Sequence, residues 1–179
     1  MTDLVKSVNW RGAVSLIGAA VLVSAHPAYP APIWLAQSNI NESSSNTPDV
    51  SVLAQKAKQL RSEGRYAEAA AIWRLLLGMA EKALGPDDPV VATSLNNLAE
   101  LLSSQGEYAA AEPLYRRSLA IYGKAFGPDH PYVAHSLNNL AELLRKQGQD
   151  AAAEPLYRRS LAIFERAFGP DHPDVAHSL

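Results

Sequence analysis

Two histidine pairs are the residues of this sequence that most resemble a metal site. His130 and His135 recur 42 residues later as His172 and His177. Two histidines on one helix share a face when they are four residues apart, and that spacing suits a metal ion. The spacing here is five, and His130 and His172 each precede a proline. We therefore expect these two histidines to help begin helices, and we expect no metal site.

Other catalytic chemistry finds no support in the residue pattern. The chain has no cysteine, which excludes disulfides, thiolate zinc sites and a cysteine nucleophile. It shows no glycine-rich phosphate loop and no Ser/His/Asp set beyond what repetition produces. The net charge is −2 and no Lys/Arg stripe is present, so nucleic acid is an improbable ligand. We expect a protein that is not an enzyme, with no catalytic residues and no cofactor.

The elements that position the remaining polar residues come from an internal repeat. The tripeptide Gly-Pro-Asp at 85–87 recurs at 127–129 and at 169–171, in steps of 42 residues. Residues 85–126 and 127–168 differ at about a quarter of their positions. A diverged unit over 49–84 precedes them, and 169–179 begins another. The sequence thus predicts a repeat domain over 49–179.

Each unit predicts two helices. Val91, Leu95, Leu98 and Leu102 form one apolar stripe at helical spacing. Asp88 suits the cap of this first helix and Pro89 its first position. Gly106 predicts the turn to a second helix that contains Pro113, and Gly127 predicts a left-handed end to it. Two such helices cannot bury their stripes alone, so we expect copies to stack into a solenoid.

These units resemble the tetratricopeptide repeat. The resemblance rests on Gly106, Tyr108, Ala111 and Tyr115, and on the large–large–small set Leu95, Leu98 and Ala99. The 42-residue length and the linker at 127–131 are closest to the kinesin-light-chain subtype. The resemblance implies an all-α solenoid of antiparallel helix pairs, wound as a right-handed superhelix. Departures from the pattern are Asp150, Ser118, Ser160 and Lys56, and the last suggests that the first unit is a cap.

In this family the first helix of each pair lines a concave surface that binds peptides. The residues of this chain at such positions are Gln55, Lys58, Arg61, Thr93, Asn96, Asn97, Glu100, Ser103, Ser104, His135, Asn138, Asn139, Glu142, Arg145 and Lys146. An asparagine side chain both donates and accepts, so a ladder of them could hold an extended backbone. The alternative is that these amides bond to neighbouring helices or face water.

The peptide-binding prediction covers eight of these residues: Asn96, Asn97, Glu100, Asn138, Asn139, Glu142, Arg145 and Lys146. The two carboxylates would repel a ligand carboxylate at short range, which argues against a clamp for a chain terminus. We expect a mixed or basic peptide, with Arg145 and Lys146 receiving its acidic part. The arginine pairs at 116–117 and 158–159 are expected on solvated faces, paired with glutamates such as Glu112.

The N-terminal region differs from the repeats. Lys6 and Arg11 precede an apolar run over 12–25, which predicts a signal peptide over 1–25; a retained membrane anchor is the alternative. Residues 26–48 are rich in proline and small polar residues, which predicts a flexible linker. We therefore expect an exported bacterial protein, periplasmic or secreted.

The predicted function is a non-catalytic scaffold that binds a protein or peptide partner. The alternative is the regulatory part of a larger multidomain protein, because the sequence ends at Leu179, partway through a first helix. A weaker option is self-assembly, since near-identical repeats can stack end to end.

Overall fold

The computed structural model describes residues 49–169, and these residues form six α-helices without a strand. The helices are α2 (Val50–Ser62), α3 (Tyr66–Leu84), α4 (Pro89–Ser104), α5 (Tyr108–Phe126), α6 (Pro131–Lys146) and α7 (Asp150–Phe168). Within this range no helix is both long enough and apolar enough to cross a bilayer. The expected signal peptide, the linker and nearly all of the last partial repeat lie outside the described residues.

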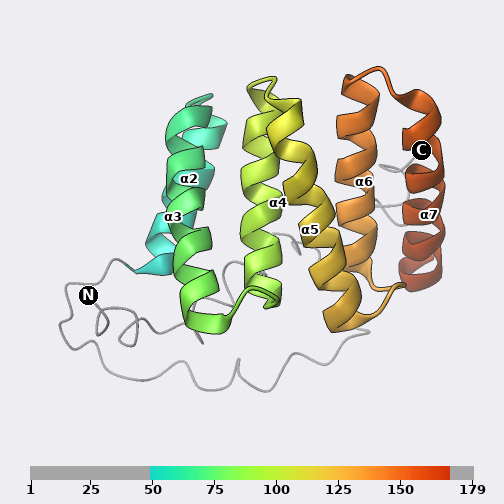
Figure 1. The fold of residues 1–179 in the computed structure, drawn as a ribbon, viewed down its shortest axis with the longest axis horizontal. Coiled ribbons are helices and arrows are strands. Elements are labelled where there is room, and N and C mark those ends of the chain that lie inside the picture. Colours follow the sequence, from blue (N-terminus) through green and yellow to red (C-terminus); the bar gives the residue numbers. More distant parts are fainter. Residues whose placement is uncertain (1–48, 170–179) are drawn as a thin grey trace.

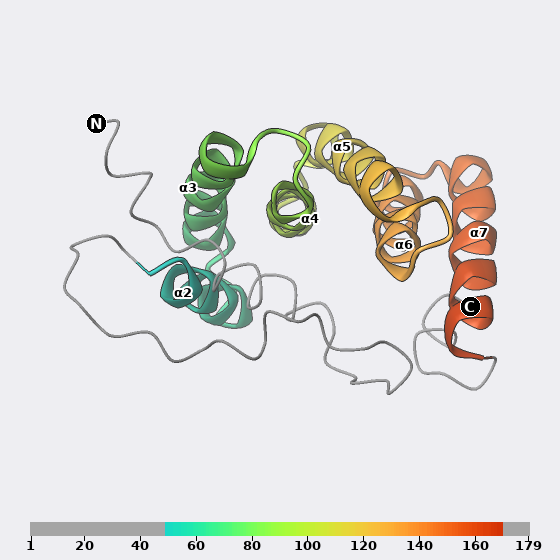
Figure 2. The ribbon, with the colours of Figure 1, turned by 90° about the horizontal axis from the view of Figure 1, so that it is seen from below.

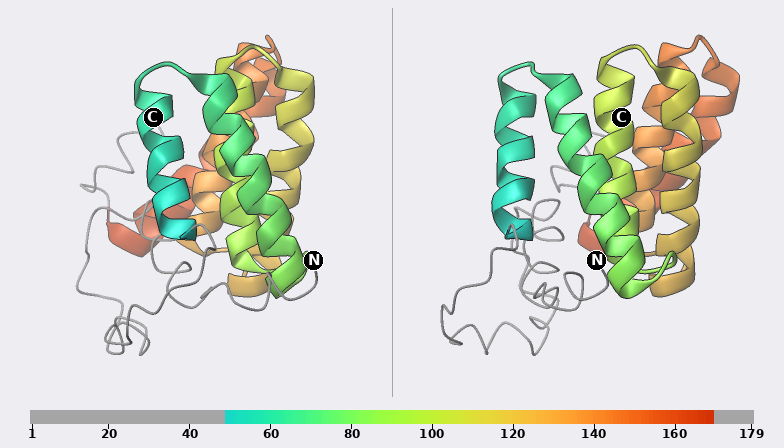
Figure 3. Two further views of the ribbon diagram at one scale, coloured as in Figure 1. Left: turned by 90° about the vertical axis from the view of Figure 1, so that its left-hand side faces the viewer. Right: turned by 60° about the vertical axis from the view of Figure 1, so that its left-hand side comes forward.

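The helices form antiparallel pairs that stack side by side in chain order (Figure 1). The closest packing lies within the pairs α4–α5 and α6–α7, and α3–α4 and α5–α6 join neighbouring pairs. In the view of Figure 2, α2, α4 and α6 lie below α3 and α5, and α7 stands beside α6 at the right-hand end of the stack. The left view in Figure 3 looks along the stack from its first pair, with α2 and α3 nearest to the viewer. This arrangement confirms the all-α solenoid.

The residues before the linker prolines, Asp88 and His130, cap the helices α4 and α6. The Asp88 carboxylate accepts a hydrogen bond from the Val90 N–H at 2.8 Å, which caps α4. His130 does the same for α6, because its Nδ1 accepts the Tyr132 N–H at 3.1 Å. Pro89 begins its helix, where the missing N–H would have no partner. The predicted roles of Asp88, Pro89 and His130 at helix starts are confirmed.

The outer helices end in a glycine conformation that differs from the expected one. Gly127 follows α5 with φ 91° and ψ 162°, and Gly85 and Gly169 adopt nearly the same angles. The expected left-handed helical stop has ψ near +47°, so that prediction is wrong in detail. The observed region is open almost only to glycine.

The core combines leucine stripes with small residues. Leu95 and Leu98 are buried, and Ala99 and Ala111 are fully buried where the paired helices meet. Ser118 is fully buried as well, and its hydroxyl donates to the Ala92 carbonyl at 2.9 Å. Ser160 makes the matching contact with Ala134 at 2.8 Å. These bonds explain why serine stands where the family has alanine, since each buried hydroxyl has an acceptor.

The first pair presents polar residues at its free side. Lys56 and Gln59 on α2 are exposed, whereas Leu98 and Leu101 at the same repeat positions of α4 are buried. Within residues 49–169 no helix pair precedes α2. Lys56 is thus exposed at a position that is apolar in the second unit, as the predicted cap would have it.

Candidate functional site

The candidate site is the surface of α2, α4 and α6, the layer that the sequence predicts to bind peptides (Figure 2). We call it the inner face and define it by the partly or fully exposed polar residues at the expected positions. These are Gln55, Lys58, Arg61, Asn96, Asn97, Glu100, Ser104, His135, Asn138, Asn139, Glu142, Arg145 and Lys146. Each position recurs from one helix to the next because the repeat length is constant.

The two asparagines of each inner helix have different surroundings. Asn96 donates from Nδ2 to the Ser136 hydroxyl at 3.1 Å, which joins α4 to α6. Its Oδ1 and the Oδ1 of Asn138 are buried and accept no hydrogen bond from the described residues. The Asn96 amide thus serves the seam between repeats, which is the alternative that the sequence left open. Peptide contact by Asn96 and Asn138 stays a prediction.

Asn97 lies one residue further around the helix and is only partly buried. Its Nδ2 donates to the Thr93 carbonyl one turn earlier at 2.8 Å. This bond fixes the side chain against its own helix and leaves Oδ1 as an acceptor. Asn97 is therefore oriented to receive an N–H group, and Asn139 occupies the same position in α6.

Thr93 does not belong to the inner face, so its assignment from the sequence is wrong. The residue is 5% exposed, and its hydroxyl lies 2.7 Å from the Tyr122 hydroxyl on α5. Ser103 is buried too, at 8% exposure. Both positions are covered because three helices, α3, α5 and α6, pack around α4 and leave only a narrow strip of it exposed.

Glu100 forms an ion pair that crosses from one repeat to the next. Its carboxylate contacts the Arg61 guanidinium of α2, and each side chain is 46% exposed. The partners are 39 residues apart in the sequence. The negative charge of Glu100 is therefore balanced by a residue of the first repeat.

Glu142 is balanced within its own repeat. Arg145 donates to both of its oxygens, at 2.9 and 2.8 Å, and Lys146 lies 3.8 Å away. The Tyr157 hydroxyl of α7 donates to the same carboxylate at 2.9 Å. The hydrogen bonds from Arg145 and then Tyr157 hold the pKa of Glu142 below its usual value, although partial burial opposes them. This carboxylate is thus ionised and fully engaged.

The charge of the inner face is consequently positive. Four cations, Lys58, Arg61, Arg145 and Lys146, accompany two carboxylates, Glu100 and Glu142. Both carboxylates already have cationic partners. The repulsion of acidic ligands expected from the sequence is therefore offset, because the arrangement carries two more positive than negative charges. Burial and then Arg61 lower the pKa of Lys58, as expected for neighbouring cations.

Aromatic residues beneath the inner face were not singled out from the sequence as site residues. Tyr115 is 3% exposed, and burial, followed by the charges of Glu100 and Glu142, raises its pKa. Tyr157 holds the equivalent position and reaches Glu142 directly. This position is tyrosine in the second and third units and Trp73 in the first. The hydroxyl group of the two tyrosines is the sequence signal for a polar role.

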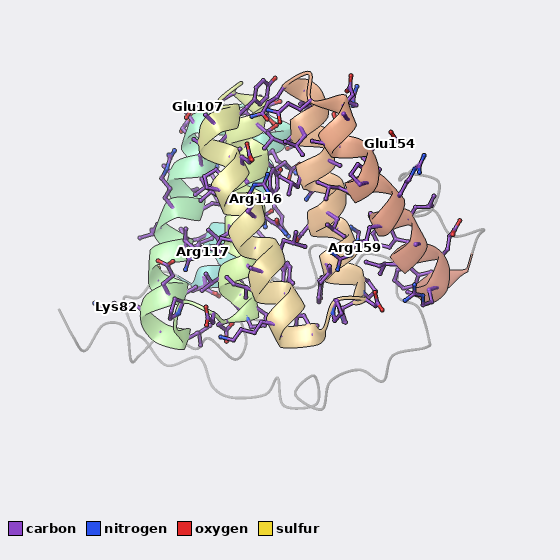
Figure 4. All side chains as sticks on the ribbon, turned by 45° about the vertical axis from the view of Figure 1, so that its right-hand side comes forward. Lys82, Glu107, Arg116, Arg117, Glu154 and Arg159 are labelled. Atoms are coloured by element: carbon purple, nitrogen blue, oxygen red, sulfur yellow. The ribbon has the colours of Figure 1, made fainter. Side chains whose placement is uncertain are left out.

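The outer face carries the arginine pairs (Figure 4). Arg116 pairs with Glu112 at 2.8 Å as expected. Arg117 instead crosses to α3 and binds Glu81 at 2.6 Å, and it also donates to the Pro86 carbonyl at 3.1 Å. Arg159 makes the equivalent bond to the Pro128 carbonyl at 3.2 Å. These second arginines therefore hold the linkers between repeats.

The histidines of the described range lie in aromatic surroundings. The His130 ring stacks on Phe126 and Tyr132, with centroids 4.7 and 5.0 Å apart. The His135 ring meets the edge of Phe164 at 4.8 Å. Over residues 49–169 no group of three or more His, Asp or Glu side chains could hold a metal ion.

The family model described as "Tetratricopeptide repeat" matches residues 49–124, 105–166 and 137–179. Among curated proteins the sequence finds no match. The fold is similar to the crystal structure of BtubC (BKLC) from P. vanneervenii, with a TM-score of 0.62 and 26% identity over 70% of this chain and 50% of that one.

A second similar structure is a Podosopora anserina protein assigned as a kinesin light chain with nearly identical TPR-like repeats. Its TM-score is 0.66 and its identity 24%, over 71% of this chain and 60% of that chain. This level of identity supports the fold alone. The chain spans 50 to 60% of the length of the two solved structures.

Proposed function

Because this chain belongs to the tetratricopeptide repeat family, we propose that it is a non-catalytic scaffold that holds an extended peptide segment of a partner protein on its inner face. The observation that carries the proposal is the charge arrangement of that face. Glu100 and Glu142 are already paired with cations, so the excess positive charge is available to a ligand. The favoured ligand is a peptide with an acidic stretch.

The residues have separate roles in this proposal. Asn97 and Asn139 accept N–H groups of the peptide backbone, which supplies affinity without selecting side chains. Arg145 and Lys146 at one end, and Lys58 at the other, attract its carboxylates. Glu100 and Glu142 orient the arginines. Long-range attraction of this kind acts on association rate and weakens with salt.

The test starts from a random peptide library selected on the immobilised protein. We expect enrichment of acidic peptides that bind more weakly as salt rises. Affinity of a selected peptide, measured by fluorescence anisotropy, should fall about tenfold in Asn97→Ala/Asn139→Ala, since two buried hydrogen bonds contribute about 0.5–1.5 kcal/mol each. It should fall as well in Arg145→Ala/Lys146→Ala.

The matched control lies on the outer face. Arg116→Ala/Arg158→Ala removes two exposed arginines that bind glutamates of their own helices. This variant also loses two positive charges. If overall charge alone attracted the peptide, affinity would fall in the control as much as in the inner-face variants. Unchanged affinity in the control and reduced affinity in the inner-face variants supports the assignment. Equal affinity in all variants, or no enrichment of acidic peptides, contradicts it.

We further propose that the scaffold is exported, on the evidence of the charged and apolar segment over 1–25. Expression of the full chain in a bacterium, followed by fractionation and N-terminal sequencing, tests this. A new N-terminus near residue 26 in the periplasmic or secreted fraction is expected. An intact chain in the membrane fraction would instead indicate an anchor.

A further inference from the structure

Two apolar side chains stand exposed on the first helix pair. Val52 on α2 is 58% exposed and Leu75 on α3 is 51% exposed. Across residues 49–169 the single other exposed large hydrophobic residue is Phe126, at 42%. Two of the three exposed large hydrophobic residues in this range thus lie on the first helix pair.

Repeat equivalence shows which direction these side chains face. Val52 corresponds to Ser136, which accepts a hydrogen bond from Asn96 on the preceding inner helix. Leu75 corresponds to Arg117 and Arg159, which bind the carbonyls of the preceding linkers. Both positions therefore face the element that comes before them in the stack. In the first repeat this is the N-terminal end of the domain, which we call the N-terminal end face.

A symmetric dimer of the chain fits this face poorly. Lys56 and Gln59 share the outward side of α2 and are exposed. A symmetric dimer would place the two Lys56 ammonium groups near each other. A stable interface also needs roughly 800 Å² from each partner, with an apolar centre, which two apolar side chains do not supply.

The chain itself carries a suitable occupant. Ile33-Trp34-Leu35 is the sole run of three large apolar residues between 26 and 48. Residues 36–48 join it to Asp49, and an extended chain of this length spans about 40 Å. A helix the length of α3 measures about 28 Å, so the run can reach any part of the end face. Tethering supplies an effective concentration on the order of millimolar, so a weak contact suffices.

We propose that Ile33-Trp34-Leu35 packs on Val52 and Leu75 at the N-terminal end face. Trp34 supplies the largest apolar area of the three residues. The segment occupies the place that a preceding repeat would take, and residues 36–48 form the connection. This contact is independent of peptide binding at the inner face.

The repeats supply a variant that removes the contact without disturbing the fold. Val52→Ser/Leu75→Arg installs residues already found at these positions, in Ser94 and Ser136 and in Arg117 and Arg159. A Trp10→Phe background leaves Trp34 and Trp73 as fluorophores, and Trp73 is 2% exposed. The probe in the full-length protein is therefore the change in Trp34 emission and its quenching by acrylamide.

In Val52→Ser/Leu75→Arg we expect the quenching constant to rise about twofold and the emission to move to longer wavelength, because the indole loses its apolar cover. Phe126→Leu is the control, since Leu84 holds that position in the first unit, and it should change neither signal. Equal quenching of the parent and the double variant would overturn the proposal. So would a difference that appears only with rising protein concentration, since that result assigns the face to a second copy.

Discussion

The buried hydroxyl pair of Thr93 and Tyr122 allows a sharp test of how the helix pairs are specified. The two oxygens are 2.7 Å apart, and Tyr122 is 2% exposed. Thr93 also donates to the Pro89 carbonyl, at 3.1 Å. In the next repeat both partners differ, with Phe164 packed on His135. The two residues have therefore changed together between neighbouring repeats.

The loss of unfolding free energy in each variant depends on whether the remaining hydroxyl keeps a hydrogen-bond partner. In Tyr122→Phe, Thr93 retains its bond to Pro89, so the free energy of unfolding should fall by about 0.5–1 kcal/mol. In Thr93→Val, the Tyr122 hydroxyl stays buried without its partner, and the loss should be about 1–3 kcal/mol. Removing both hydroxyls leaves no unpaired group. The double variant should therefore be more stable than Thr93→Val alone.

Urea denaturation of the four proteins, followed by circular dichroism, measures these free energies and their coupling. Tyr157→Phe is the matched control. Its hydroxyl binds the partly exposed Glu142, where water can replace it, so the loss should stay below about 0.5 kcal/mol. A double variant as unstable as the sum of the single ones, with no coupling beyond about 0.3 kcal/mol, would refute the reasoning.

Three further predictions concern caps, linkers and surface charge. Burial lowers the pKa of His130, and its neutral Nδ1 caps α6. The stability that the neutral imidazole contributes is complete above the unfolded pKa, near 6.5, and is lost as the pH falls. In His130→Asp the unfolding free energy should therefore change less steeply with pH between 7 and 5. Gly127→Ala should cost about 1–3 kcal/mol because of its φ of 91°, whereas Gly123→Ala, with open space inside α5, should stabilise by about 0.5–1 kcal/mol in thermal unfolding. Arg61→Ala should change the unfolding free energy by less than about 1 kcal/mol and by less still at high salt, since its pair with Glu100 is half exposed. Equal pH slopes, destabilisation by Gly123→Ala or a loss well above 1 kcal/mol for Arg61→Ala would contradict these expectations in turn.

The repeat architecture could be predicted because it depends on local patterns that recur. The leucine stripe, the cap at Asp88 and the turn at Gly106 each follow from a few neighbouring residues, and recurrence at a spacing of 42 confirms their register. The family resemblance then indicated that the first helix of each pair lines the concave surface. None of these steps needed contacts between distant residues.

The details of the site depend on such contacts and were less accessible. Glu100 was expected to repel acidic ligands, but Arg61 from another helix balances it. Thr93 was placed on the wrong side because a stripe divides a helix into two faces, whereas an inner helix has neighbours on three sides. The amide of Asn97 could have faced either its own helix or solvent, and spacing does not decide between them.

The linker contacts bear on how this chain could lengthen. Arg117 and Arg159 bind the carbonyls of Pro86 and Pro128, and Lys124 and Arg166 bind the linker aspartates at 2.5 and 2.9 Å. The outer helices α5 and α7 thus each fasten the segment that introduces their own repeat. A duplicated 42-residue unit therefore carries both halves of its fastening, and growth by whole units requires no compensating change elsewhere.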